Sequence, residues 1–416
     1  MQNPMENLIF YLIIGILLME YLVERILGQL NLNHYQTTVP RELRKICDEE
    51  KYRQAREYYV ANHRFSMVTS GFHLLLILGM LVFGGFALVD HWVHQIAGHP
   101  VWVTLLFFGI LMLASSLINI PFEAYDTFVI EEKFGFNRTT VKTFIADHIK
   151  SWILGGITGG GILALVVWFW TLTGPSFWLW AWGLITLFSL FITMFYSTLI
   201  VPLFNKQRPL EEGSLRNAIE SFTQKAGFRL DSIYVIDSSR RSTKSNAYFS
   251  GLGRKKRVVL FDTLIDEMSE EEIVAILAHE VGHYKKKHIW KGLLAGTAQT
   301  GLTLFLLSLL INEPVTAGVL GTEQHGFHTG LLVFGLLYSP VSTLLGIVMN
   351  RFSRKNEFQA DAFAREQYNG EALASALKKL SVKNLSNMNP HPLYVFVHYS
   401  HPPLLERIKR LQGRSE

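Results

Sequence analysis

The chain alternates long apolar stretches with polar, charged segments. A helix of about 20 residues spans the hydrocarbon core of a bilayer, which is about 30 Å thick. The first apolar stretch has no basic residue before it and no small-residue cleavage site after it, so we expect a retained span rather than a signal peptide. The pattern predicts an all-α membrane protein with seven transmembrane helices. Their predicted spans are residues 8–27, 67–89, 101–120, 152–172, 177–200, 292–311 and 330–349.

Lys and Arg lie on one side of these predicted spans. The segments without Lys or Arg are residues 1–7, 90–100, 173–176 and 312–329. All 39 Lys and Arg lie at the end of the first span or in residues 28–64, 121–150, 201–291 and 350–416. Cytoplasmic loops collect these residues. We therefore expect the N-terminus outside and the C-terminus in the cytoplasm, in the plasma (inner) membrane of a bacterium or the endoplasmic reticulum of a eukaryote.

The composition agrees with a membrane protein and excludes several other classes. Hydrophobic residues make up 49% of the chain and charged residues only 18%, which does not fit a soluble globular protein. Aromatic residues occur throughout, which argues against a disordered or nucleic-acid-binding chain. The single cysteine, Cys47, excludes a disulfide framework and a multi-cysteine metal site. A metal ion would need His, Asp or Glu ligands.

Two polar segments are long enough to hold catalytic machinery. We expect residues 1–200 to form a membrane region with five spans. Residues 201–291 and 350–416 are then the two cytoplasmic parts that carry the chemistry, and residues 292–349 form the transmembrane hairpin between them. A site built from both parts would lie at the membrane face.

The motif HEVGH lies in the first of these cytoplasmic parts. The sequence of residues 269–272 predicts a capping box that starts an amphipathic helix. On this helix His279 and His283 are four residues apart, so their rings can bind one zinc ion, with Glu280 beside them as a candidate general base. His288, five residues further on, is less well placed. The alternative is a pair of surface histidines that bind no metal.

A candidate third ligand follows the seventh span. A catalytic zinc ion takes three protein ligands and keeps one position open. Glu357 in the motif NEFQADAFA offers a carboxylate, and Asp361 lies four residues later on the same predicted helix. Asp361 could then accept a hydrogen bond from a ligand histidine. Taken alone, this motif would more often be a solvated helix face.

Three short segments upstream of the metal helix have the pattern of β-strands. They are residues 232–237, 246–252 and 257–265. A small sheet beside the metal could bind an extended peptide through main-chain hydrogen bonds. The pattern alone does not separate this role from simple support of the helix.

The segment HPPLLER, residues 401–407, combines a histidine, two prolines and an arginine. Taken alone, it is typical of a surface histidine followed by a helix that starts after prolines.

Two non-enzymatic interpretations are less consistent with the sequence than a metallopeptidase. A seven-helix transporter or receptor would carry ionisable residues near the middle of its spans and interrupted helices in paired halves. The predicted spans are nearly free of charge at their centres and show no half-repeat. A membrane chaperone with a degenerate metal site is also disfavoured, because no ligand or catalytic residue is missing.

Blocks along nearly the whole chain resemble a known family. The chain is similar to the integral-membrane zinc CAAX prenyl endopeptidases, the type I CAAX proteases that process yeast a-factor and prelamin A. Besides HEVGH, the resemblance lies in EEKFGFNRTT (131–140), VPLFNK (201–206), SNAYFSG (245–251), VVLFDTLI (258–265), EFQADAFA (357–364) and YSHPPLLERI (399–408).

This resemblance implies a fold and a set of residue roles. The fold would be a barrel of seven tilted helices around a water-filled chamber, capped by a zincin-like metalloprotease domain with a small β-sheet. One zinc ion per chain would be bound by His279, His283 and Glu357, with Glu280 as general base and acid. The remaining roles are oxyanion stabilisation by His401, support of the ligands by Asp361 and Arg407, and substrate binding by the strand that contains Asn246, Ala247, Tyr248 and Gly251.

The resemblance also implies a peptide or protein substrate. The substrate would be a CAAX-type C-terminus, prenylated or not, or another extended peptide. The chain is short beside fungal and animal members, which is typical of a bacterial-type member. A membrane-protein quality-control protease that needs no prenyl group is the alternative. The expected surroundings are a lipid bilayer and no nucleic acid, and the expected state is a monomer.

Overall fold

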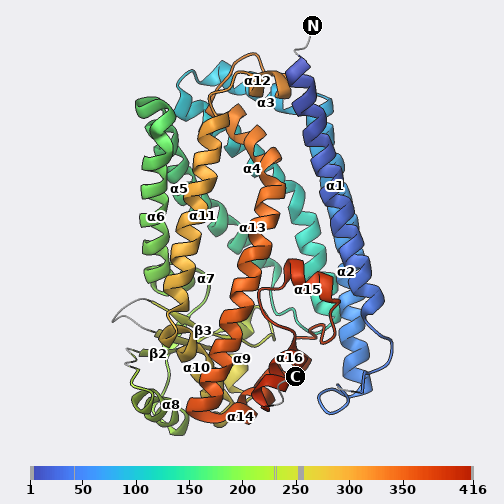
Figure 1. Cartoon of the computed structure of the whole chain (residues 1–416), viewed down its shortest axis with the longest axis vertical. Coiled ribbons are helices and arrows are strands. Elements are labelled where there is room, and N and C mark those ends of the chain that lie inside the picture. Colours follow the sequence, from blue (N-terminus) through green and yellow to red (C-terminus); the bar gives the residue numbers. More distant parts are fainter. Residues whose placement is uncertain (1–3, 42, 229, 231, 252–256, 414–416) are drawn as a thin grey trace.

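The structure is a computed structural model, and it describes residues 4–41, 43–228, 230, 232–251 and 257–413. Long helices run along the longest axis of the molecule, and a smaller part with strands and short helices lies at one end (Figure 1). The N-terminus lies at the opposite end from this smaller part, and the C-terminus lies within it.

Seven long helices match the predicted transmembrane spans. Six helical segments are long and apolar enough to cross a membrane. One of them, residues 141–204, contains two spanning helices that turn at Gly174–Ser176, so the prediction of seven spans is confirmed. The spanning helices are α1 (Pro4–His34), α2 (Glu49–Val82), α4 (Pro100–Tyr125), α5 (Val141–Thr173), α6 (Phe177–Phe195), α11 (His288–Leu310) and α13 (Phe327–Ala364).

The spanning helices form a closed ring. Helix α1 contacts α2, α4 contacts α5, α5 contacts α6, α6 contacts α11, and α11 contacts α13. Helix α2 also contacts the π-helical turn η1 (Asp126–Glu131) that continues α4, and α13 contacts α1. Every spanning helix therefore has a neighbour on each side, and the barrel that the resemblance implied is confirmed.

Two short helices, α3 (Gly85–Ile96) and α12 (Val315–Leu320), lie across the barrel end that is remote from the strands (Figure 1). The predicted span 67–89 is therefore wrong at its C-terminal end, because α2 stops at Val82. Gly84 has a φ of 70°, a left-handed conformation that favours glycine and ends the helix. The apolar residues after it belong to α3, where Phe86 and Val93 are buried.

The smaller part contains a four-stranded sheet with the order β1-β2-β4-β3. Strands β2 and β4 are parallel, and β1 and β3 pair antiparallel with their neighbours. The three predicted strands are confirmed, whereas β1 was not predicted; residue 252, the end of one predicted strand, lies outside the described residues. The strands are β1 (Gln207–Pro209), β2 (Ser232–Ile236), β3 (Ala247–Ser250) and β4 (Arg257–Phe261).

The predicted third strand, residues 257–265, is too long. Strand β4 ends at Phe261, and the next four residues form the short helix α9 (Asp262–Ile265). The Asp262 carboxylate accepts hydrogen bonds from the backbone N–H groups of Ser239 and Thr263. These bonds fix the turn after the strand, since aspartate favours such local bonds to the backbone.

The sheet packs on helices that carry the metal motif. Buried side chains of α10 (Glu270–Lys285), such as Leu277 and Val281, share one core with Leu260 of β4 and Phe222 of α8 (Ser214–Lys225). The other short elements are α7 (Val201–Phe204), α14 (Gly370–Lys383), α15 (Pro392–His398), α16 (Leu404–Leu411), η3 (Tyr196–Ile200), η4 (Ser238–Arg240) and η5 (Arg365–Asn369).

Two spanning helices continue directly into this part. Helix α13 is 38 residues long and carries the seventh span together with the motif around Glu357. Helix α11 starts at His288, close after α10 ends at Lys285. The membrane barrel and the metal motif are therefore joined by continuous or nearly continuous helix.

Candidate metal centre

The helix that carries HEVGH begins at a complete capping box. The Ser269 hydroxyl accepts a hydrogen bond from the backbone N–H of Glu272 at 3.3 Å, and the Glu272 carboxylate accepts one from the N–H of Ser269 at 2.9 Å. Glu272 also accepts hydrogen bonds from Ser375 and Lys379 of α14. The predicted capping box is confirmed, and it ties the start of α10 to α14.

His279, His283 and Glu357 converge on one point. The two Nε2 atoms are 3.1 Å apart, Nε2 of His279 is 3.4 Å from Oε2 of Glu357, and Nε2 of His283 is 3.3 Å from Oε1 of Glu357. Among the described residues, these three form the group of His, Cys, Asp and Glu that could hold a metal ion.

The spacing of these ligand atoms fits a tetrahedral ion. Bonds of about 2.0–2.1 Å to a tetrahedral zinc ion place its ligand atoms about 3.3–3.4 Å apart. The two Nε2 atoms are 3.1 Å apart, and Oε2 and Oε1 of Glu357 lie 3.4 and 3.3 Å from His279 and His283, so either carboxylate oxygen is close to the position that this geometry requires. Two imidazoles and one carboxylate are also a donor set found at catalytic zinc sites with an open fourth position.

Asp361 and Arg407 form a buried network behind His279. Nδ1 of His279 lies 2.8 Å from Oδ1 of Asp361, and Arg407 donates two hydrogen bonds to the same carboxylate, at 2.6 and 2.8 Å. The bond from Nδ1 leaves the Nε2 lone pair for a metal. Burial lowers the pKa of His279, but the hydrogen bonds to Asp361 and Glu357 outweigh it and raise the pKa to about 9.

Glu280 follows the first ligand histidine and is half-buried. Within the described ranges its carboxylate makes no hydrogen bond or ion pair, and its charge stabilises the cation of Arg407 at longer range. A carboxylate without a fixed partner beside a metal site is free to accept a proton.

His401 flanks the same site from the loop before α16. Its Nε2 lies 3.4 Å from Oε1 of Glu357, and its Nδ1 lies 3.0 Å from the Ser400 hydroxyl. The side chain is 66% exposed, unlike the buried ligand Glu357. An imidazole with an exposed edge beside the ligands can donate a hydrogen bond to a bound substrate.

The predicted substrate-binding residues lie on or next to β3, one of the two edge strands of the described sheet. This strand pairs with β4 on one side and contacts α10, the helix that carries the two histidines. The hydroxyl of Tyr248 is buried without a hydrogen-bond partner among the described residues, and burial raises its pKa to about 12. Asn246 precedes the strand, Ala247 is its first residue, and Gly251 follows it with a φ of 95°.

Two residues near the ligands were not predicted. The sequence places His288 less well than His279 and His283 for binding the same metal, and it offers no signal for Gln359. The structure brings His288 within 3.1 Å of the ring of His283 and within 2.9 Å of the Gln359 side chain. A continuous helix would turn residue 288 away from residue 283, and only the break after α10 brings it back. The local sequence gave no signal for that break.

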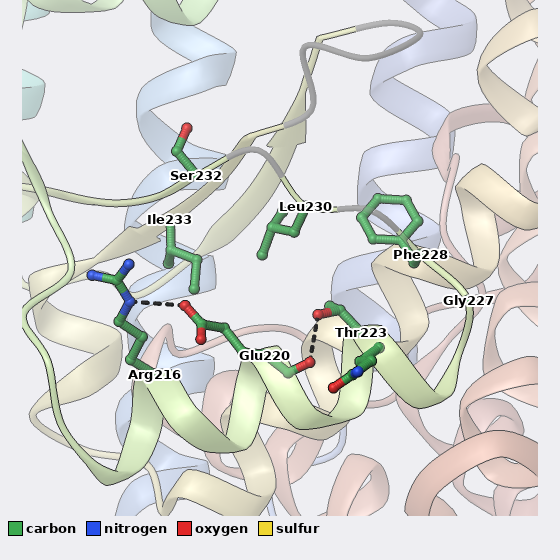
Figure 2. Close-up of a pocket in the computed structure, with 9 residues that line it drawn as sticks. Arg216, Glu220, Thr223, Gly227, Phe228, Leu230, Ser232 and Ile233 are labelled. Carbon is green, nitrogen blue, oxygen red and sulfur yellow. Dashed lines mark hydrogen bonds and ion pairs between the residues drawn. The ribbon is translucent and has the colours of Figure 1, made fainter.

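A separate cavity of about 450 Å³ lies between α8 and the sheet (Figure 2). Its polar side chains are partly paired among themselves, since Arg216 donates a hydrogen bond to Glu220 at 2.9 Å. None of the metal-centre residues lines it.

The chain is similar to known membrane peptidases over nearly its whole length. Residues 29–206 match the family described as CAAX prenyl protease N-terminal, five membrane helices, and residues 209–415 match peptidase family M48. A CAAX prenyl protease 1 homolog of Arabidopsis thaliana is 35% identical, with 99% of this chain and 98% of the relative covered. CAAX prenyl protease 1 of Saccharomyces cerevisiae is 36% identical, with 92% and 90% covered. The crystal structure of S. mikatae Ste24p matches with a TM-score of 0.92 at 33% identity, with 97% of this chain and 99% of that chain covered.

Proposed function

The chain belongs to the membrane-bound CAAX prenyl protease family of M48 peptidases, and from this premise we propose that His279, His283 and Glu357 hold one catalytic zinc ion. The protein is a multi-pass integral membrane metallopeptidase that acts on peptides in a lipid environment. The observation that carries the proposal is the convergence of three side chains: the two Nε2 atoms lie 3.1 Å apart, and each lies 3.3–3.4 Å from an oxygen of the Glu357 carboxylate. Zinc supplies Lewis acidity at a site of two imidazoles and one carboxylate.

In this proposal Glu280 handles the proton of the hydrolysis. Its carboxylate takes a proton from the attacking water and passes it to the amine that leaves when the peptide bond breaks. The absence of a hydrogen bond or ion pair to this carboxylate among the described residues supports this role. Asp361 and Arg407 keep His279 in the tautomer whose Nε2 lone pair faces the site.

His401 is proposed to stabilise the negative charge that develops on the scissile carbonyl oxygen. Its Nε2 points toward the ligands and its ring is open to a substrate. Strand β3 is proposed to bind the peptide as an added strand, through main-chain groups from Asn246 to Gly251. Its edge position and its contact with α10 support this role.

We propose C-terminal CAAX peptides, with or without a prenyl group, as the substrates. The relatives over the full length of the chain carry the name CAAX prenyl protease. They disfavour the alternative of a quality-control protease. The space enclosed by the helix ring is proposed to accommodate a prenyl chain and to let the peptide reach the site at the membrane face.

The proposed topology places the N-terminus outside and the C-terminus in the cytoplasm, in one monomer. It divides the chain into the membrane region 1–200, the peptidase parts 201–291 and 350–416, and the hairpin 292–349 between them. Since Cys47 is the only cysteine, single cysteines introduced into a Cys47→Ser background can be labelled with an impermeant maleimide to test the orientation. Labelling of a cysteine at residue 98 from the outside, and of one at residue 211 from the cytoplasm, is expected. The reverse pattern would overturn the orientation, and light scattering of the detergent complex would test the monomer.

The test of the function is cleavage of a peptide that ends in a CAAX box, farnesylated or not. Detergent-purified, zinc-loaded protein is incubated with each peptide, and the products are read by mass spectrometry against the Glu280→Gln variant. Release of the last three residues by the wild-type protein alone is expected. Cleavage only of an unfolded or membrane-derived peptide would favour quality control, and no cleavage with zinc bound would overturn the proposal.

A further inference from the structure

We propose that His288 and Gln359 are positioning residues that hold the ring of the metal ligand His283 through a chain of two hydrogen bonds. This inference rests on the proposed function, because it concerns one of the proposed zinc ligands. It adds a partner for His283 that corresponds to the Asp361 carboxylate behind His279.

The contacts follow one line from the ligand to α13. Nδ1 of His283 lies 3.1 Å from Nδ1 of His288, and Nε2 of His288 lies 2.9 Å from Oε1 of Gln359. His288 is buried, with 6% of its surface exposed, so water does not compete freely for these bonds. Nε2 of His283, on the other edge of its ring, faces Glu357 and His279.

Only one arrangement of protons on His288 and His283 lets these two hydrogen bonds support His283 as a metal ligand. An amide oxygen can only accept, so Nε2 of His288 must donate to Gln359. Nδ1 of a neutral His288 then accepts the proton of Nδ1 of His283. His283 is thereby fixed in the tautomer whose Nε2 carries a lone pair toward the metal. The opposite orientation of the amide would place a proton on that Nε2 and abolish ligation.

These two hydrogen bonds link His283 to both helices of the transmembrane hairpin. His288 is the first residue of α11, and Gln359 lies on α13 between Glu357 and Asp361. Lys287, just before His288, has a φ of 58°, a left-handed conformation that L-residues rarely adopt. This turn redirects the chain after α10 and returns His288 toward His283. The short segment 357–361 of α13 thus provides Glu357 as a proposed ligand. It also provides Asp361 to support His279, and Gln359 to support His283 through His288.

The proposal predicts different zinc affinities for two substitutions of His288, asparagine and glutamine, that are similar in size and polarity. Asparagine at residue 288 keeps an acceptor oxygen near the place of Nδ1, whereas glutamine keeps an amide near Nε2 and loses that acceptor. We expect His288→Asn to bind zinc within about threefold of the wild-type protein, and His288→Gln to bind it about 10- to 100-fold more weakly, as for other groups that orient metal ligands. At the next position, Gln359→Glu keeps the acceptor and should stay close to wild type, whereas Gln359→Leu should weaken zinc binding in the same range.

The experiment measures zinc affinity of the full-length protein in detergent by competition with a chelator. The visible spectrum of the cobalt-substituted protein reports the ligand geometry, and the melting temperature of the metal-free protein reports folding. The exposed His91, which pairs with Gln95 on the remote helix α3, provides matched control variants, His91→Asn and His91→Gln. Both should bind zinc like the wild-type protein.

The outcomes distinguish this inference from the proposed function. If the wild-type protein and His279→Ala bind zinc equally, the proposed site is wrong. If His279→Ala abolishes binding while all variants at His288 and Gln359 bind as the wild type, only the positioning role is overturned. Equal loss in His288→Asn and His288→Gln, with unchanged melting of the metal-free protein, would also overturn the proposed proton arrangement.

Discussion

Gly282 of α10 lies directly against Ala360 of α13. A Cβ atom at residue 282 would be 3.0 Å from Cα and 3.1 Å from the carbonyl oxygen of Ala360, closer than side chains normally pack on backbone. The glycine therefore sets how closely the two helices approach. Since α10 carries His279 and His283 and α13 carries Glu357, this approach also sets the distance between the proposed ligands.

Gly282→Ala should push α10 and α13 apart. Because the obstacle is backbone, the methyl group cannot be accommodated by a rotamer change, and overpacking of this kind costs about 1–3 kcal/mol. We expect a lower melting temperature together with weaker zinc binding. Gly292→Ala is the control, because a Cβ at that residue of α11 would meet no atom within 4 Å. Unchanged zinc affinity in Gly282→Ala would show that this helix contact does not determine the ligand geometry.

Glu280→Gln and His401→Ala should both keep the metal and differ in the depth of the catalytic defect. Loss of a general base typically costs about 10²–10⁴ in rate. Loss of one hydrogen-bond donor to an oxyanion costs about 10²–10³, so His401→Ala should retain weak activity. His401 is 66% exposed, and its removal should leave the melting temperature nearly unchanged. Peptide cleavage is measured at equal zinc content, and wild-type rates in Glu280→Gln would contradict its role.

Asp361→Leu, which keeps the size of the side chain but removes both acceptor oxygens, should damage both stability and the metal centre. Arg407 is buried and donates two hydrogen bonds to Asp361, and breaking a buried ion pair by removing one partner costs about 3–5 kcal/mol; its remaining carboxylate contact is Glu357, at 3.6 Å. His279 loses its acceptor for Nδ1 as well, which should weaken zinc binding about 10- to 100-fold. Denaturation and chelator competition measure the two effects. Arg407→Lys tests the fork geometry, since lysine keeps the charge but cannot form both bonds.

The capping box at the start of α10 should make the peptidase domain sensitive to acid. Burial raises the pKa of Glu272, but hydrogen bonds from Lys379, Ser375 and the Ser269 backbone outweigh it and lower the pKa below its ordinary 4.5. A group whose pKa is lower in the folded state stabilises the fold above the unfolded pKa and loses this contribution as pH falls through the folded pKa. The melting temperature should therefore fall as the pH is lowered below about 4.5.

Glu272→Gln provides the control for this pH dependence. At neutral pH the variant loses the charged capping contact, worth about 1 kcal/mol. Its melting temperature should fall less steeply than that of the wild-type protein below pH 4.5, because the titrating group is gone. Parallel curves for the two proteins would show that other carboxylates dominate the acid response.

Much of the architecture was determined by local features of the sequence. Hydrophobic length predicted the seven spans, because a bilayer imposes one length on every helix that crosses it. The pattern from Ser269 to Glu272 predicted the helix start, because all partners of a capping box lie within four residues. The spacing of His279 and His283 predicted a shared face. The errors fell at element ends, where Gly84 stops α2 and Asp262 turns β4 into α9.

Only the tertiary structure decided how the separate motifs meet. Glu357 reaches the histidines because Gly282 admits Ala360, and His288 reaches His283 because the chain reverses at Lys287. The edge position of β3 likewise depends on its pairing with β4 and on the parallel pairing of β2 with the other edge of β4. Contacts of this kind join residues that are far apart in the chain or separated by an irregular turn. No local period or propensity encodes their distances, because these distances are set by how whole helices and strands pack.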